Sequence, residues 1–166
     1  MALRTVAMDI DDTDRLILQL LQQNSRMSNA EIGRRVGLVP SSVFQRVRRL
    51  EDRGIVERYG CVLNASALDA GLIAFVMIRT SDASAERGAG ALLAAMPHIL
   101  EVHRVVGDAC FIVKARVRDT EALDAMLETI VRIPSIVSTR TTVVVRTMKE
   151  TLQLPLPVSG DDCPAT

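Results

Sequence analysis

Two helical patterns separated by a very short turn restrict the fold of this 166-residue chain more than any other feature. Residues 28–31, Ser-Asn-Ala-Glu, have the spacing of a capping box, which predicts a helix that ends at Gly37. Only residues 38–40 separate it from the next pattern, which covers residues 41–53 and has apolar residues at i, i+4 and i+7. An amphipathic pattern over residues 11–23 adds a preceding helix. Together they predict a helix-turn-helix, in which the last helix can enter a DNA major groove.

Basic residues gather on this pair of helices although the whole chain has no net charge, with 20 Lys and Arg against 20 Asp and Glu. Residues 34–49 include five Arg and no acidic residue. Such a cluster suits a polyanion, because binding DNA requires neutralised phosphates. Taken alone, the pattern also fits an ordinary surface helix with a solvated Arg face. The capped helix and the short turn before it favour DNA.

We divide the candidate DNA contacts into groups that read bases and groups that hold phosphates. The base-reading candidates carry hydroxyl or amide groups, and an amide pairs well with adenine; they are Ser41, Ser42 and Gln45. The phosphate candidates on the last helix are guanidinium groups: Arg46, Arg48 and Arg49. Arg34 and Arg35 of the preceding helix are expected to flank the groove.

The second half of the chain alternates strand and helix patterns. Strands are predicted over 72–80, 99–106, 110–117 and 139–148, and helices over 84–96 and after Asp119. This βαββαβ order is that of a ferredoxin-like domain, so the predicted fold class is α+β: a winged-helix-like helix-turn-helix followed by a ferredoxin-like domain. Strands 72–80 and 110–117 are largely apolar on both faces, which predicts that the face without helices is buried, most simply by homodimerisation.

The expected domains are a DNA-binding domain over 1–63, a linker over 64–71, a ligand-sensing and oligomerisation domain over 72–154, and a mobile tail over 155–166. The β-branched run after Gly54 is predicted as a strand that leads into the linker. The chain has no apolar run long enough for a membrane span and no leader pattern at its start. We therefore expect a cytoplasmic, nucleoid-associated protein without a membrane partner.

Few residues of this chain are suited to catalysis or metal binding. The three Cys are widely spaced and the two His lack ligand-like neighbours, so we predict no metal site and no cofactor. Cys110 is the one candidate nucleophile, but the sequence places neither a base nor a helix N-terminus beside it. We predict that the protein is not an enzyme.

Motifs along nearly the whole chain, from about residue 9 to 157, resemble those of the Lrp/AsnC, or feast/famine, family of transcription regulators. The matching segments are residues 11–14, 17–18, 24–26, 28–32, 36–38, 46–51, 54–56, Tyr59, 74–76, 102–108, Thr141 and 149–156. The resemblance implies a sequence-specific regulator that binds double-stranded DNA and forms homodimers, often octamers or larger rings. It also implies that an amino acid or a related metabolite changes its assembly or its DNA affinity.

The resemblance places the effector at four residues: Gly107, Asp108, Cys110 and Thr141. The family usually has Tyr and then Asp after the Gly-Asp turn, whereas this chain has Ala109 and Cys110, so the pocket lacks a carboxylate that would hold an ammonium group. A ligand-independent architectural protein that coats and bends DNA is therefore the alternative. The family also usually has Ser where this chain has Val39, which removes a helix cap worth about 1 kcal/mol unless a following Ser replaces it.

Overall fold

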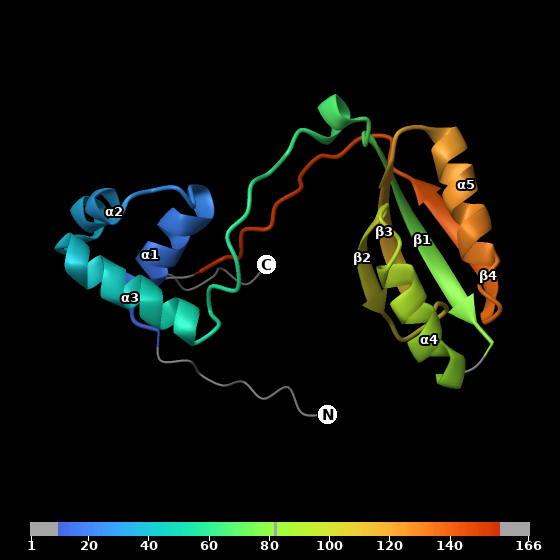
Figure 1. Ribbon diagram of the computed structural model, residues 1–166, viewed down its shortest axis with the longest axis horizontal. Helices are drawn as coiled ribbons and strands as arrows, with labels where there is room; N and C mark the ends of the chain where they lie inside the picture. The colour runs from blue at the N-terminus through green and yellow to red at the C-terminus, as the bar shows by residue number, and fades with distance from the viewer. Residues whose placement is uncertain (1–9, 82, 157–166) are drawn as a thin grey trace, which may run out of the picture. The chain divides into compact units, whose positions relative to one another are not determined.

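The computed structural model describes residues 10–81 and 83–156, with only the backbone for residues 83–85. The chain forms two compact units (Figure 1). One contains the residues up to Val62 together with those from Thr151 onward, and the other contains residues 63–150. We describe each unit separately.

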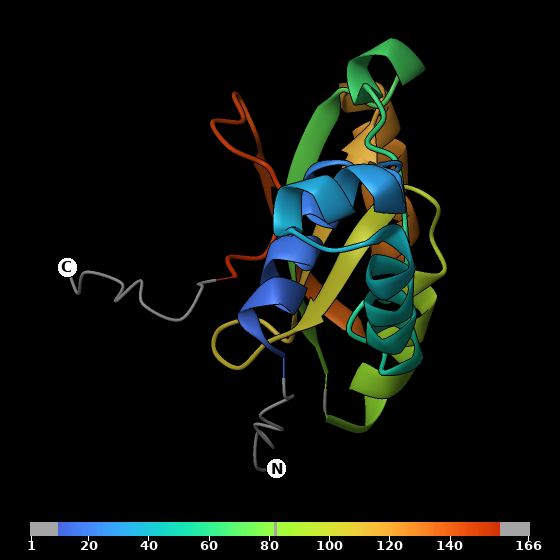
Figure 2. The same ribbon diagram turned by 90° about the vertical axis from the view of Figure 1, so that its left-hand side faces the viewer.

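The first unit is built on three helices that pack against one another: α1 (Asp12–Gln23), α2 (Asn29–Val36) and α3 (Pro40–Asp52) (Figure 2). Asp11 caps α1 by accepting from the Asp14 amide at 2.7 Å, and Ser28 caps α2 as the sequence predicts. Ile17, Ile32 and Val43, one from each helix, have no exposed surface. These side chains are the centre of the core of this unit, and partly buried apolar residues of the three helices pack around them.

The turn between α2 and α3 depends on two glycines. A Cβ at Gly33 would lie 2.4 Å from the Leu38 carbonyl oxygen, so only glycine allows α2 to approach the turn this closely. Gly37 ends α2 in the left-handed conformation, with φ of 74°, which glycine adopts at little cost. The helix-turn-helix predicted from the short spacing is therefore formed, and it presents α3 at a fixed angle to α2.

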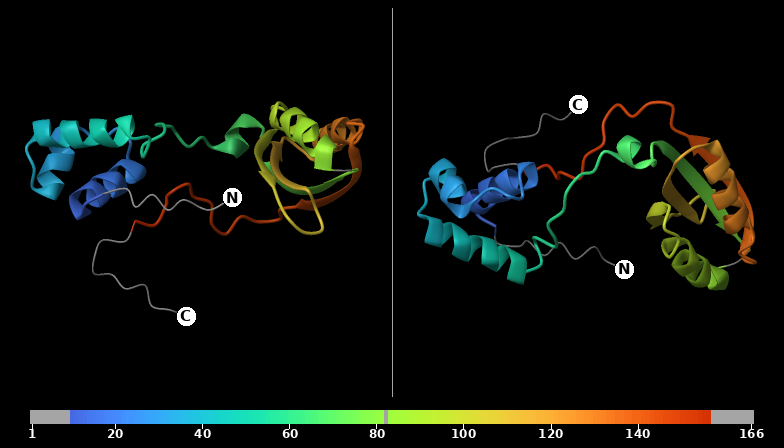
Figure 3. Two further views of the ribbon diagram at one scale, coloured as in Figure 1. Left: turned by 90° about the horizontal axis from the view of Figure 1, so that it is seen from below. Right: turned by 45° about the horizontal axis from the view of Figure 1, so that its top comes forward.

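The second unit is a four-stranded antiparallel sheet with two helices on one face (Figures 1 and 3). After a short 3-10 turn at Ala65–Leu68, its elements follow in the predicted βαββαβ order: β1 (Leu72–Thr80), α4 (Ala83–Ala94), β2 (Ile99–Arg104), β3 (Phe111–Val117), α5 (Thr120–Val131) and β4 (Ile136–Val143). The strand order is β2-β3-β1-β4, which is the ferredoxin-like arrangement.

The two faces of this sheet differ in composition. The face under α4 and α5 is fully apolar at its centre, where Val76, Ile78 and Val113 have no exposed surface. We call the other side the open face. The strand register places these side chains on it: Ile73, Phe75, Met77, Ile112, Lys114 and Arg116. The prediction of two apolar faces is therefore correct for most of β1 but wrong for β3, whose open face is mainly basic.

Two strand predictions need correction. Residues 55–64 form no strand; Tyr59 instead donates a hydrogen bond to Glu51 of α3, at 2.7 Å. The last strand covers 136–143 rather than 139–148, because its partner β1 runs from Leu72 to Thr80 and pairs Thr80 with Ile136 and Ala74 with Val143.

The segment 151–156 lies with the first unit. The predicted sensor domain, residues 72–154, overlaps this segment at residues 151–154. The Gln22 side chain accepts from the Leu154 amide at 2.6 Å and donates to the Leu154 carbonyl at 3.2 Å. Gln19 donates to the Leu156 carbonyl at 2.8 Å. These bonds tie the segment to α1. The predicted mobile tail lies outside the described residues from residue 157 onward.

Candidate nucleic-acid interface and effector site

The outer face of α3 carries three of the predicted DNA contacts. Ser41, Gln45 and Arg48 are all exposed, and they lie one and two turns apart on the side opposite the buried Val43 and Leu50. Ser42 is half-buried. Within the described residues no side chain caps the N-terminus of α3, so neither serine replaces the missing cap at Val39.

The arginines on the flank of α3 next to α1 have carboxylate partners. Arg46 contacts Asp11 at 2.6 Å and Asp14 at 2.8 Å, and Arg49 contacts the other Asp14 oxygen at 2.6 Å. Asp14 has no exposed surface, so its charge is held by these two guanidinium groups and not by water. The hydrogen bond from Arg46 lowers the pKa of Asp11, and the hydrogen bonds to Asp11 and Asp14 raise the pKa of Arg46.

This cluster joins α3 to α1, and it gives the two sides of α3 different electrostatic surroundings. On the α1 side, Arg46 and Arg49 are matched by Asp11 and Asp14. On the outer side, no ion pair of Arg48 is found among the described residues. Arg48 therefore has the guanidinium that is most available to a phosphate.

The arginines of α2 differ in the same way. Arg35 pairs with Glu31 at 2.8 Å, one turn earlier on the helix, and both side chains are about half exposed. Arg34 is exposed, and in the described part of the chain it has no ion pair. Arg34 is the better candidate for a groove-flanking contact.

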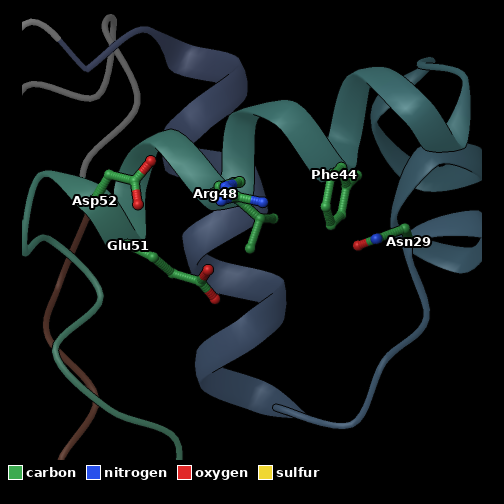
Figure 4. Close-up of a pocket in the computed structure, with 6 residues that line it drawn as sticks. Asn29, Phe44, Arg48, Glu51 and Asp52 are labelled. Atoms are coloured by element: carbon green, nitrogen blue, oxygen red, sulfur yellow. The ribbon is translucent and has the colours of Figure 1, made fainter.

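Phe44 is an exposed residue of α3 that the sequence analysis missed, with 52% of its surface accessible. It lines a shallow pocket of about 420 Å³ with these residues: Asn29, Val47, Arg48, Glu51 and Asp52. Figure 4 shows Phe44 and Asn29 facing each other, with Arg48 and Glu51 further along the helix. The signal was present in the sequence, because position 44 lies off the apolar stripe of residues 43, 47 and 50.

The hydrogen bond from Tyr59 to Glu51 ties the segment after α3 to the C-terminal end of that helix. Partial burial and this bond raise the pKa of Tyr59 to about 12. The Glu51 carboxylate is therefore engaged by a hydrogen bond within the first unit.

The four predicted effector residues lie at two places in the sheet unit. Gly107 and Asp108 are exposed in the β2–β3 turn, where Gly107 has φ of 142°. Cys110 is half-buried beside that turn and donates its amide to the Ile78 carbonyl at 2.8 Å. Thr141 pairs with Val76 on the far side of β1, so two strand spacings, about 10 Å, separate the backbones of β3 and β4.

Neither a metal centre nor a membrane span is indicated by the described residues. No three His, Cys, Asp or Glu side chains among them come together in a way that would hold a metal ion. None of the described helices has the length and apolarity needed to cross a bilayer.

Comparison with known proteins identifies both units. A winged helix-turn-helix DNA-binding model matches residues 10–57, and the Lrp/AsnC ligand binding domain matches residues 73–154. The leucine-responsive regulatory protein of Salmonella typhimurium is 40% identical over 154 residues, which are 88% of this chain and 91% of that protein. The chain belongs to the Lrp/AsnC family. It is a DNA-binding transcription regulator and not an enzyme, as the sequence motifs predicted.

Solved structures of Lrp/AsnC regulators and related proteins agree with both units. A transcriptional regulator of Neisseria meningitidis in complex with L-Met has a TM-score of 0.84 at 31% identity, covering 88% of this chain and 96% of that one. A feast or famine regulatory protein of M. tuberculosis complexed with L-methionine has a TM-score of 0.82 at 32% identity, covering 89% and 99%. The α+β fold and its two units are thus shared with other regulators.

Proposed function

We propose that this regulator binds an amino acid through its sheet unit and that binding changes its assembly or its DNA affinity. The observation that carries the proposal is the match of residues 73–154 to the Lrp/AsnC ligand binding domain. Two proteins of similar structure, from Neisseria meningitidis and M. tuberculosis, were solved with methionine.

The β2–β3 turn offers groups that suit an amino acid. Gly107 has φ of 142°, which residues with a side chain rarely adopt, and the absence of a Cβ leaves its main chain open to a ligand. Asp108 is an exposed carboxylate next to it and would pair with the ammonium group in place of the Asp that Cys110 replaces. Thr141 would contribute a hydroxyl from β4.

Homo-oligomerisation belongs to the same proposal. Phe75 on the open face is 38% exposed, and Met77 and Ile112 lie beside it on β1 and β3. A second copy of the chain would cover this apolar centre. Lys114 and Arg116 lie beside this centre on β3, where Glu150 pairs with both, so a second copy would also meet charged groups there.

For DNA, we propose that α3 enters the major groove with Ser41 and Gln45 at base edges and Arg48 at a phosphate. Arg34 would hold a second phosphate. The exposure of these side chains, and the carboxylate partners of Arg46 and Arg49, support this division.

Two measurements on the purified full-length chain test the proposal. Thermal shift against each of the twenty amino acids should identify one or more that stabilise the protein. Fluorescence anisotropy on the regulator's own upstream DNA and on random DNA should then show a change in selective affinity with that amino acid. The Gly107→Val and Thr141→Val variants should lose the thermal shift, whereas Val62→Ala, at a 95% exposed position in the other unit, should keep it.

The second candidate is an architectural protein that needs no ligand. Cys110, at the position where the family usually has Asp, favours it. If no amino acid shifts the melting temperature and DNA binding is equal on both duplexes, the architectural function replaces the regulatory proposal.

A further inference from the structure

Phe44 is an aromatic side chain in the middle of a polar helix face. It is 52% exposed, while Val43 and Leu50 of the same helix are fully buried. Gln45, the next residue of α3, is exposed as well. A single exposed apolar residue is common on a protein surface, so exposure alone assigns no role to Phe44.

The position of Phe44 on α3 is set by the helix period. Ser41, Phe44, Gln45 and Arg48 are related by steps of three and four residues, so they share one face. The adjacent flank is different, because Arg46 and Arg49 there are bound to Asp14 of α1. The face that contains Phe44 is therefore the one that α1 leaves free.

The neighbours of Phe44 further define which part of this face can approach DNA. Asn29, the first residue of α2, lies across the shallow pocket from Phe44 (Figure 4). Toward the other end of α3 the pocket is lined by Glu51 and Asp52, whose charges repel phosphate. The half of α3 from Pro40 to Arg48 is thus the half that a groove can accept, and Phe44 lies near its centre.

A major groove offers one apolar group to such a side chain, the 5-methyl group of thymine. We propose that Phe44 contacts a thymine methyl group in the bound site and is a specificity-determining residue of this regulator. The inference rests on the proposed docking of α3 in the major groove. Gln45, on the next position, would read a neighbouring base by hydrogen bonding, so the two residues favour A·T-containing steps by different chemistry.

The test uses the full-length protein and a duplex that it selects from a random-sequence pool. Each thymine of that duplex is replaced in turn by uracil, which removes the methyl group and leaves the base pairing intact. For the unchanged protein, one replacement per half-site should weaken binding about fourfold, the effect of one buried methyl group. The Phe44→Ala variant should bind the thymine duplex more weakly and show no further loss with uracil at that position.

Two control variants separate this contact from general effects. Val62→Ala changes an apolar side chain that is 95% exposed in the same unit, and it should keep the full uracil effect. Gln45→Ala should lower selectivity at a different base and also keep the uracil effect. Circular dichroism of Phe44→Ala should match that of the unchanged protein, because more than half of the replaced side chain is exposed.

The outcomes distinguish the two proposals. An equal uracil penalty in Phe44→Ala and in the unchanged protein overturns the thymine contact and leaves DNA recognition by α3 in place. The thymine contact is also overturned if no uracil replacement in the selected duplex weakens binding. Equal binding to selected and random duplexes overturns the groove docking itself, and with it the role of Phe44.

Discussion

Arg46 and Arg48 are two residues apart on α3, but the structure gives them different surroundings. Arg46 lies against α1, where it shares the buried carboxylate of Asp14 with Arg49. Arg48 is exposed on the outer side, in a pocket with Phe44 and Asn29. A cluster of like charges in the sequence is thus divided into one group that holds the unit together and one group that is free to bind. The following experiments test this division.

Removing the Asp14 carboxylate should have the largest effect. The Asp14→Ala variant leaves Arg46 and Arg49 without their shared partner and empties a fully buried position. We expect the first unit to lose about 3 kcal/mol of stability. Urea denaturation followed by circular dichroism measures the loss.

Glu31→Ala is the matched control for that loss. It also removes a carboxylate from an arginine, but the Glu31–Arg35 pair is about half exposed on one helix. Such pairs contribute less than about 1 kcal/mol. If Asp14→Ala and Glu31→Ala had equal effects, the buried cluster would not be what joins α3 to α1.

Replacing each arginine by Met separates the two roles directly, since Met keeps an unbranched apolar chain. Arg46→Met should destabilise the unit by about 2 kcal/mol, because Asp14 loses one of its two partners. Arg48→Met should leave stability unchanged and lower the slope of log affinity against log salt by about 1, the signature of one lost phosphate contact. Equal losses of slope in both variants, measured by anisotropy at several salt concentrations, would contradict the division.

Tyr59 tests the side of α3 that carries Phe44 and Arg48, because its hydroxyl donates to Glu51 there. It is the only Tyr and the chain has no Trp, so the long-wavelength ultraviolet band of tyrosinate follows its ionisation alone. Burial and the Glu51 carboxylate raise its pKa to about 12, so the stabilising contribution is complete below pH 10 and is lost as pH rises toward 12. In Glu51→Gln the midpoint should move down toward 10. An unchanged midpoint would mean that Glu51 does not hold the hydroxyl.

The smallest effect is expected at Asp11, which is mostly exposed. The hydrogen bond from Arg46 lowers its pKa in the folded state, so its contribution is present above the ordinary carboxyl pKa and is lost as pH falls through the lower folded value. Asp11→Asn keeps a capping oxygen and removes only the charge. The variant should therefore be slightly less stable than the unchanged protein at pH 6, and the difference should vanish once acid protonates Asp11 in the folded state. A difference that persists in acid would exclude the charge as its cause.

The first unit was largely predictable because its signals are local. The Ser28 cap, the left-handed Gly37 and the short turn each act within a few residues, and the structure has helices at these places. The pairing of Asp14 with Arg46 was not foreseen, since 32 residues separate them. A signal existed even so: Asp14 lies one turn before Ile17 and Leu18 on the apolar stripe of α1, where an acid needs a partner.

For the sheet unit, the order of strands and helices was predicted correctly. The bounds of the last strand and the composition of the open face were not. The start and end of β1 match the predicted strand, because apolar residues fill both of its faces. The predicted last strand was displaced because the β-branched run continues past Val143, whereas the pairing of β4 with β1 runs from Ile136 to Val143. Cross-strand pairing fixes that register, and no local pattern encodes it.

The attachment of residues 151–156 to α1 makes the first unit discontinuous in sequence. Residues 63–150 are inserted, in sequence terms, into a DNA-binding unit whose last backbone segment follows them and is held by Gln19 and Gln22. A fragment that stops at Val62 therefore lacks part of that unit. An exchange of sensors between two regulators of this kind should transplant residues 63–150 and keep the final segment with the recipient, as one would replace a loop and not a C-terminal domain.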